Sequence, residues 1–145
     1  MPCSRRDSLV ALASALISTP FAASAAPPAA PLPSRVYSFA DLPVHGRPEA
    51  RSRPVLAGRT HTGFSIELHE TALAPGARPH PPHHHAHEEV FLMRQGQLEV
   101  TIAGRSATIG PGGVAYIASN QEHGVRNAGG ETAQYFVMAL GTDRG

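Results

Sequence analysis

Apolar and polar residues alternate along several short stretches of the chain, and turn residues separate these stretches. The clearest alternation, Phe64-Ser65-Ile66-Glu67-Leu68, predicts a strand with one face directed toward a core, and residues 36–39 and 55–57 predict weaker strands. From residue 75 onward the rhythm is regular, and further strands are predicted at 90–93, 98–102, 107–109, 114–117, around 125 and 134–140. No stretch has a convincing helical period. The pattern predicts an all-β barrel or sandwich.

The composition agrees with a turn-rich β domain. The 145 residues include 14 glycines and 14 prolines, and only 16% are charged, which favours short strands and turns over a helical bundle. The last predicted strand is apolar at consecutive positions from Tyr135 to Leu140. Both of its faces should therefore be covered, one by the barrel interior and the other by a second sheet or subunit. We expect a homodimer.

The first 25 residues have the layout of an export signal. Arg5 and Arg6 precede an apolar run, and Ala23-Ser24-Ala25 forms an A-x-A cleavage pattern. The apolar run is too short to span a membrane. Residues 4–9 also resemble a twin-arginine signal, apart from Ser8, so the twin-arginine and the ordinary secretory routes both stay open. We expect a periplasmic or secreted protein, with an Ala/Pro-rich spacer at 26–35 and one domain at 36–145.

Several functional classes are excluded by residue types that the chain lacks. The formal net charge is only +1, so nothing calls for a nucleic acid or an anionic membrane as partner. The single cysteine, Cys3, lies in the signal, which leaves the mature chain without a thiol nucleophile or a disulfide. The chain has no lysine for Schiff-base catalysis and no G-x-S-x-G elbow. Metal chemistry in this protein must therefore use nitrogen and oxygen ligands.

A dense histidine cluster reads His80-Pro-Pro-His83-His84-His85-Ala-His87-Glu88-Glu89. It is either a low-complexity tract that picks up metal without fixed geometry or a defined site. In an extended chain, side chains at 83 and 85 point to the same side and the side chain at 84 to the other. Glu89 lies a few residues further on, and two imidazoles with one carboxylate are typical of Fe(II) and similar ions. The only later histidine, His123, is a candidate fourth ligand.

The spacing of these residues resembles the two motifs of the cupin superfamily. The run Gly76, His83-x-His85-x3-Glu89-x6-Gly96 resembles the first motif, with one extra residue before the first histidine. The run Gly112-x5-Ala118-x-Asn120-x2-His123-x3-Asn127 resembles the second, with Ala118 in place of proline and Asn120 in place of glycine. Asparagine tolerates the left-handed conformation, so we expect Asn120 to keep the turn.

The resemblance to small bacterial cupins implies a double-stranded β-helix, or jelly-roll barrel, with metal ligands at His83, His85, Glu89 and His123. A competing register would use His85 and His87 and would break the spacing to the carboxylate. A barrel that keeps these residues without binding metal is a further alternative. His80, His84 and His87 are expected at the rim of the site.

The implied ligand set is typical of a catalytic metal site rather than of a structural site with all positions filled. Four protein ligands leave two coordination positions of an octahedral ion open. Phe91 and Met93 share the parity of Glu89 along a strand, and with Val125 they should line an apolar pocket or simply pack the core. The cofactor is expected to be one divalent transition metal: Fe, Mn, Ni, Zn or Cu. No residue stands out as a dedicated general base, and the resemblance to cupins implies that Glu89 can act as catalytic base as well as ligand. The leading hypothesis is a dioxygenase-like enzyme acting on a small organic substrate, and the alternative is a non-catalytic periplasmic module that binds a small molecule or metal.

Overall fold

The computed structural model describes residues 30–141. This part of the chain contains one short 3-10 helix, η1 (Phe39–Asp41), and strands β1 (His45–Arg47), β2 (Ala50–Arg59), β3 (Ser65–Leu73), β4 (Glu88–Gln95), β5 (Leu98–Ile102), β6 (Arg105–Ile109), β7 (Val114–Ile117), β8 (His123–Asn127) and β9 (Ala133–Gly141). The expected all-β architecture is confirmed. Within the described residues no helix is long and apolar enough to cross a membrane.

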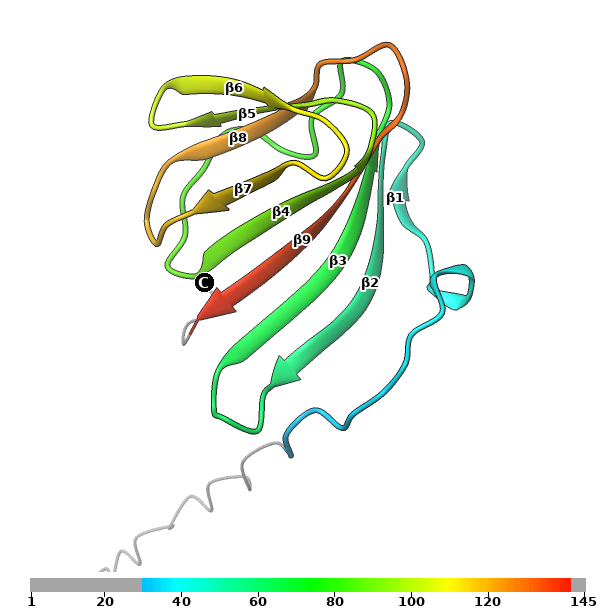
Figure 1. Cartoon of the computed structure of the whole chain (residues 1–145), viewed down its shortest axis with the longest axis vertical. Helices are drawn as coiled ribbons and strands as arrows, with labels where there is room; N and C mark the ends of the chain where they lie inside the picture. The colour runs from blue at the N-terminus through cyan, green and yellow to red at the C-terminus, as the bar shows by residue number, and fades with distance from the viewer. Residues whose placement is uncertain (1–29, 142–145) are drawn as a thin grey trace, which may run out of the picture.

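The strands form two sheets that enclose a common core. The larger sheet has the order β1-β2-β3-β9-β4-β7 and the smaller has the order β6-β5-β8, with every pairing antiparallel. Figure 1 shows the larger sheet curving below the smaller one, with β9, the last strand, between β3 and β4. Strands from distant parts of the chain are thus neighbours, so the arrangement depends on long-range pairing.

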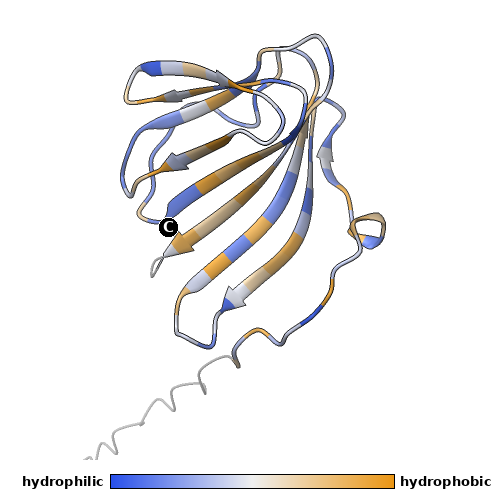
Figure 2. Cartoon of the chain, in the orientation of Figure 1, coloured by the Kyte–Doolittle hydropathy of each residue, from blue (hydrophilic) through white to orange (hydrophobic). Residues whose placement is uncertain are grey.

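Alternation of side chains gives the larger sheet an inner and an outer face. On β3, β4 and β9, the inner positions carry Leu73, Phe91, Met93, Tyr135 and Val137, all at most 5% exposed. They pack with residues of the smaller sheet to form the core. The alternation is visible along β3 in Figure 2, where polar and apolar residues follow one another. Apolar positions spaced two apart therefore fix which face of each strand points inward.

The N-terminal part of the domain differs from the sequence expectation. The strand predicted at 36–39 is wrong, because residues 36–38 have no regular structure and Phe39 begins the 3-10 helix. The Phe39 ring instead lies beneath two guanidinium groups, 4.9 Å from Arg53 Cζ and 4.3 Å from Arg94 Cζ. This cation–π packing holds η1 against the outer face of the larger sheet. The predicted signal segment lies outside the described residues, and of the spacer only residues 30–35 are described, without regular structure.

Asn127, at the end of β8, ties three parts of the barrel together. Its side-chain amide is fully buried and donates to the carbonyls of Leu73 and Glu131, at 2.9 Å and 2.7 Å. Its side-chain oxygen accepts from the backbone N–H of Gly129 at 2.9 Å. The last residue of the second sequence motif therefore joins β8 to the end of β3 and to the turn before β9.

Glu70 is a buried carboxylate on the outer face of β3. Its side chain is 2% exposed, Oε2 lies 3.7 Å from Nε of Arg53, and Oε1 has no hydrogen-bond partner. Burial raises the pKa of Glu70, although the positive charges of Arg53, Arg94 and Arg51 oppose the shift. Because the folded state favours the protonated form, the stability that Glu70 contributes is present at low pH and is lost as pH rises through its raised pKa.

We predict that Glu70→Gln makes the protein more stable than wild type at about pH 8, by on the order of 1 kcal/mol, because a neutral amide avoids the cost of burying a charge. Urea unfolding followed by circular dichroism between acidic and alkaline pH measures this difference. It should shrink as the pH is lowered and Glu70 becomes protonated. A wild type that gains stability over the variant with rising pH would contradict the raised pKa.

Candidate metal centre

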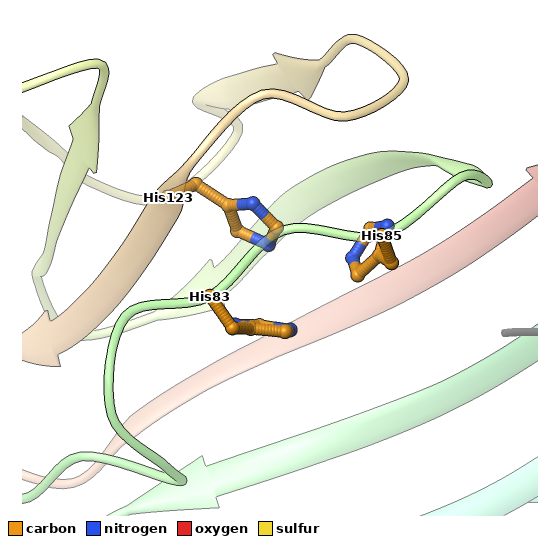
Figure 3. A group of neighbouring side chains, drawn as sticks. All are labelled: His83, His85 and His123. Atoms are coloured by element: carbon orange, nitrogen blue, oxygen red, sulfur yellow. The ribbon is translucent and has the colours of Figure 1, made fainter.

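Three histidines and one glutamate from different parts of the chain converge between the two sheets. His83 and His85 lie in the connection between β3 and β4, Glu89 is the second residue of β4, and His123 is the first residue of β8. In Figure 3 the three imidazole rings face a common space, two from the connecting segment and one from β8. The structure thus brings together all four residues that the sequence motifs singled out.

The backbone fixes the positions of these side chains. His83 and His123 form an isolated antiparallel bridge, in which each backbone N–H donates to the other residue's carbonyl at 2.9 Å. The backbone N–H of Asn120 donates to the carbonyl of His85 at 2.8 Å. Asn120 has φ of 59°, which confirms the left-handed turn expected at this position. The loop before β8 is therefore bonded directly to the segment that carries the other two histidines.

Backbone carbonyls orient two of the imidazoles. Nδ1 of His85 lies 2.8 Å from the carbonyl oxygen of His87, and Nδ1 of His123 lies 2.9 Å from that of Gln121. Since a carbonyl only accepts, each Nδ1 must carry the proton, and each Nε2 is left with a free lone pair. Metal-binding histidines are commonly oriented by such a bond through the ring's other nitrogen.

The nitrogens directed at the common space lack hydrogen-bond partners. Over residues 30–141, four buried side-chain nitrogen or oxygen atoms have no partner, and three of them are Nδ1 of His83, Nε2 of His85 and Nε2 of His123. His83, His85 and His123 can each offer one ring nitrogen such that the three nitrogens lie within 4.8 Å of one another. Leaving buried polar atoms unpaired is costly, and one cation coordinated by all three would remove that cost. The donor set therefore fits a divalent transition-metal ion.

Glu89 completes the set with a negative charge. Its Oε2 lies 3.2 Å from Nε2 of His123, and its Oε1 lies 3.5 Å from Nε2 of His85 and of His87. Burial lowers the pKa of His83, as do nearby His80, His123 and His85, while Glu89 opposes the shift. A lowered pKa keeps His83 neutral at physiological pH, which is the form that binds a metal.

Ring orientation distinguishes the two possible ligand registers. His85, His87 and Glu89 also form a close group, but the rings of His85 and His87 are stacked, with centroids 3.5 Å apart and an angle of 8° between their planes. Imidazole lone pairs lie in the ring plane, so two parallel stacked rings cannot both point at one ion. The rings of His83, His85 and His123 are inclined by 47° to 73° to one another, which lets their lone pairs converge. The geometry favours the register with His83.

A cavity of about 410 Å³ opens beside Glu89 and His123. Its walls include Phe91 and Val125, which the sequence placed in a pocket, whereas Met93 is buried in the core and does not line this cavity. The sequence did not single out the polar side chains of the opposite wall, which are His69, Thr71 and Tyr135. A larger, mostly apolar hollow of about 570 Å³ beside β5, β6 and β7 has no histidine or carboxylate in its lining.

Comparison with known proteins agrees with the fold and the motifs. Residues 69–139 match the cupin domain family, and these residues contain all four candidate ligands. The chain belongs to the cupin superfamily. This cupin is 36% identical over 73 residues to L-ectoine synthases of Bordetella parapertussis and Bordetella bronchiseptica. The matched stretch covers 50% of this chain and 54% of each synthase, so the chain spans about half the length of these curated relatives.

Solved structures show the same fold at low sequence identity. KdgF from Halomonas sp. superposes with a TM-score of 0.65 and 16% identity over 77% of this cupin and 97% of that chain. The polyketide cyclase RemF from Streptomyces resistomycificus superposes with a TM-score of 0.60 and 24% identity, over 75% of this cupin and 80% of that chain. A variant of oxalate decarboxylase from Bacillus subtilis superposes with a TM-score of 0.61 and 24% identity, over 75% of this cupin and 30% of that chain. The barrel is thus shared by proteins with different names and reactions.

We predict that His123→Ala weakens binding of Zn(II) or Co(II) by more than about 100-fold, because it removes one ligand and leaves a gap in the donor set. Competition with a chelator, followed by calorimetry, measures the affinity. The control is His61→Ala, since His61 is exposed in the β2–β3 turn. Equal affinities for the two variants would contradict the assignment of His123.

Proposed function

We propose that this cupin is a metal-dependent enzyme that acts on a small organic substrate in the cavity beside Glu89 and His123. The observation that supports this most strongly is the set of three buried, unpartnered imidazole nitrogens next to a cavity large enough for a small molecule. A purely structural metal site would have no need of an adjoining open space. Here two of the four candidate ligands, Glu89 and His123, form part of the cavity wall.

The bound ion would supply Lewis-acid chemistry, and redox chemistry as well if it is iron, manganese or copper. Phe91 and Val125 give the cavity apolar surface that limits access of water. Glu89 faces both His123 and His87 through its two oxygens, so it can hold a proton on one oxygen while the other stays near the ligands. We therefore assign Glu89 the role of catalytic base in addition to that of ligand.

For the reaction class, we favour an O2-dependent oxidation of the dioxygenase type, because three imidazoles and one carboxylate suit Fe(II) and leave positions for substrate. The second candidate is a ring closure without O2. RemF, which shares the fold, is named a polyketide cyclase, and the 36% identical relatives are named synthases rather than oxygenases. A non-catalytic binding module would use the same ligands without turnover.

We further propose that two copies associate through the outer face of the larger sheet. Leu92, Val114 and Tyr116 are 45%, 56% and 54% exposed, and they lie together on the paired strands β4 and β7. Neighbouring β9 adds Phe136 and Met138 to the same face, opposite Leu92 and Val90. The smaller sheet covers the inner face alone, so a second copy with the same apolar surface is the partner that matches this face in a two-fold arrangement.

Export is proposed from the first 25 residues alone. Their charged start, apolar run and A-x-A pattern are those of a cleaved signal. Cell fractionation of the producing organism tests this, with the mature protein expected in the periplasm or medium. Recovery of uncleaved protein solely from the cytoplasm would refute it.

The enzymatic proposal predicts O2 consumption by protein reconstituted with Fe(II) when aromatic and flavonol-like compounds are supplied. Glu89→Gln should lower kcat by about 100-fold or more, because the amide cannot accept the proton, whereas His61→Gln should act as wild type. Oxygen uptake at an electrode and product mass spectrometry measure the activity. Product that forms equally well without O2 would favour ring closure, and absence of both turnover and stoichiometric metal would overturn the proposal.

The dimer predicts that Leu92→Glu produces monomers by placing a charge in the interface. Analytical ultracentrifugation measures the mass. Phe64→Glu is the matched control, because Phe64 is 57% exposed but precedes β3 in the β2–β3 turn, away from this face. A wild-type protein that is monomeric at all concentrations would rule out the interface.

A further inference from the structure

A second group of ionisable side chains faces the metal centre from the other side of the cavity. His69 lies on the inner face of β3 and lines the cavity together with Glu89 and His123. Its Nδ1 is 3.4 Å from Oε1 of Glu67, two residues earlier on the same face. The His69 side chain is 26% exposed and that of Glu67 is 55% exposed. The pair therefore sits at the open end of the barrel, within reach of both cavity and solvent.

The sheet register places this pair at a defined distance from the ligands. Glu67 pairs with Ala139 of β9, and Ala139 pairs with Glu89 of β4. In the next row, His69 pairs with Val137, which pairs with Phe91. Neighbouring strands are about 4.8 Å apart, so the backbones of Glu67 and Glu89 are separated by about 10 Å. The small side chain of Ala139 between them leaves that space open.

β3 is paired on both sides at His69, and the ladder to β2 shifts register next to it, between Pro54 and Leu56. His69 is opposite Pro54 of β2 and Val137 of β9, and neither neighbour can ionise. Glu67 does not itself line the cavity; the ionisable residues that line it with His69 are Arg47, Arg51, His80, Glu89, His123 and Tyr135. Burial raises the pKa of Tyr135, so its phenol stays neutral. His69 is the histidine on the wall facing the ligands that has a carboxylate partner of its own.

A carboxylate beside Nδ1 favours the tautomer with the proton on that nitrogen, which leaves Nε2 as the proton acceptor. The same carboxylate stabilises the imidazolium once the proton has been taken up. His69 and Glu67 thus have the chemical features of an acid–base pair, and the substrate of the proposed enzyme would lie between this pair and the ion.

We propose that His69, oriented by Glu67, accepts a proton from a substrate held at the metal centre. This rests on the proposed function and adds a second proton acceptor: His69 takes the proton that the substrate loses on binding, whereas Glu89 acts as base during turnover. The substrate class is a small molecule with an acidic O–H next to the atom that binds the ion, such as an enol, a catechol or a hydroxamic acid. The O–H bond breaks, its proton moves to Nε2 of His69, and its electron pair stays on the substrate oxygen. No oxidant or reductant is needed for this step.

Acetohydroxamic acid is a suitable probe, because it loses its O–H proton when it binds a metal ion. Calorimetry of the Zn(II)-loaded protein at about pH 8, in two buffers with different ionisation enthalpies, counts the protons released to solution. Wild type should release almost no proton to solution when the probe binds, because His69 takes the proton up. His69→Gln should release about one more proton per site than wild type, and it should bind acetohydroxamic acid about tenfold more weakly. Glu67→Gln should give an intermediate count.

His61→Gln is the control, since His61 is exposed in the turn between β2 and β3 and does not line the cavity. It should match wild type in both proton count and affinity. Zinc content is measured for each variant, so that loss of the ion is distinguished from loss of the proton acceptor. Equal proton release by wild type and His69→Gln, with zinc retained, would overturn the proposal.

A second measurement in metal-free protein separates this inference from the proposed function. Nitrogen-15 NMR of the histidine rings reports the tautomer of His69 without any ion or substrate. The proposal predicts the Nδ1–H form in wild type and its loss in Glu67→Gln. If the protein binds no metal, the proposed function fails while this spectrum still decides the orientation of His69. An Nε2–H tautomer that does not respond to Glu67→Gln would overturn the pair.

Discussion

The candidate centre depends on the backbone bridge between His83 and His123. These residues are distant in sequence, and two reciprocal N–H to carbonyl bonds of 2.9 Å hold them opposite each other. A backbone pair of this kind leaves little freedom to the side chains that it carries. The third bond, from Asn120 to the carbonyl of His85, fixes the remaining histidine relative to the same loop. The connection before β4 and the loop before β8 therefore behave as one unit.

That unit keeps its geometry because the barrel holds its two parts together. β8 pairs with β5 in the smaller sheet, and Glu89 enters from β4 of the larger sheet. Asn127 anchors the far end of β8 through its bonds to Leu73 and Glu131. The candidate ligands thus come from both sheets, and long-range pairing along the barrel holds the three imidazoles close together. A flexible histidine tract would have no such support.

The sequence predicted most strands of the barrel, although not β1, and it singled out four candidate ligands that the structure brings together, because both leave periodic signals. Apolar positions two apart located β5 and β7 at their observed bounds, and the spacing of His83, His85 and Glu89 indicated which side chains share a face. The failures have a common cause. Phe39 looked like part of a strand but packs beneath two arginines, and Met93 shares the parity of Phe91 but lies in the core. The local sequence pattern specifies which face of a strand a residue occupies. Whether an inward-facing residue lines the cavity or packs in the core depends on neighbouring residues that are far away in sequence.

The sequence could not predict that His69 and Tyr135 line the cavity, for the same reason. His69 and Tyr135 lie in strands whose alternation indicated only packing, and only the register shows that His69 of β3 and Tyr135 of β9 share the inner face of the larger sheet with Glu89 of β4. The most direct test of the account is anomalous diffraction from crystals of the mature protein loaded with Co(II). We predict one dominant peak, about 2.1 Å from Nδ1 of His83 and from Nε2 of His85 and His123, with the carboxylate of Glu89 alongside. A dominant peak on His80, His84 or His87, or none at all, would contradict it.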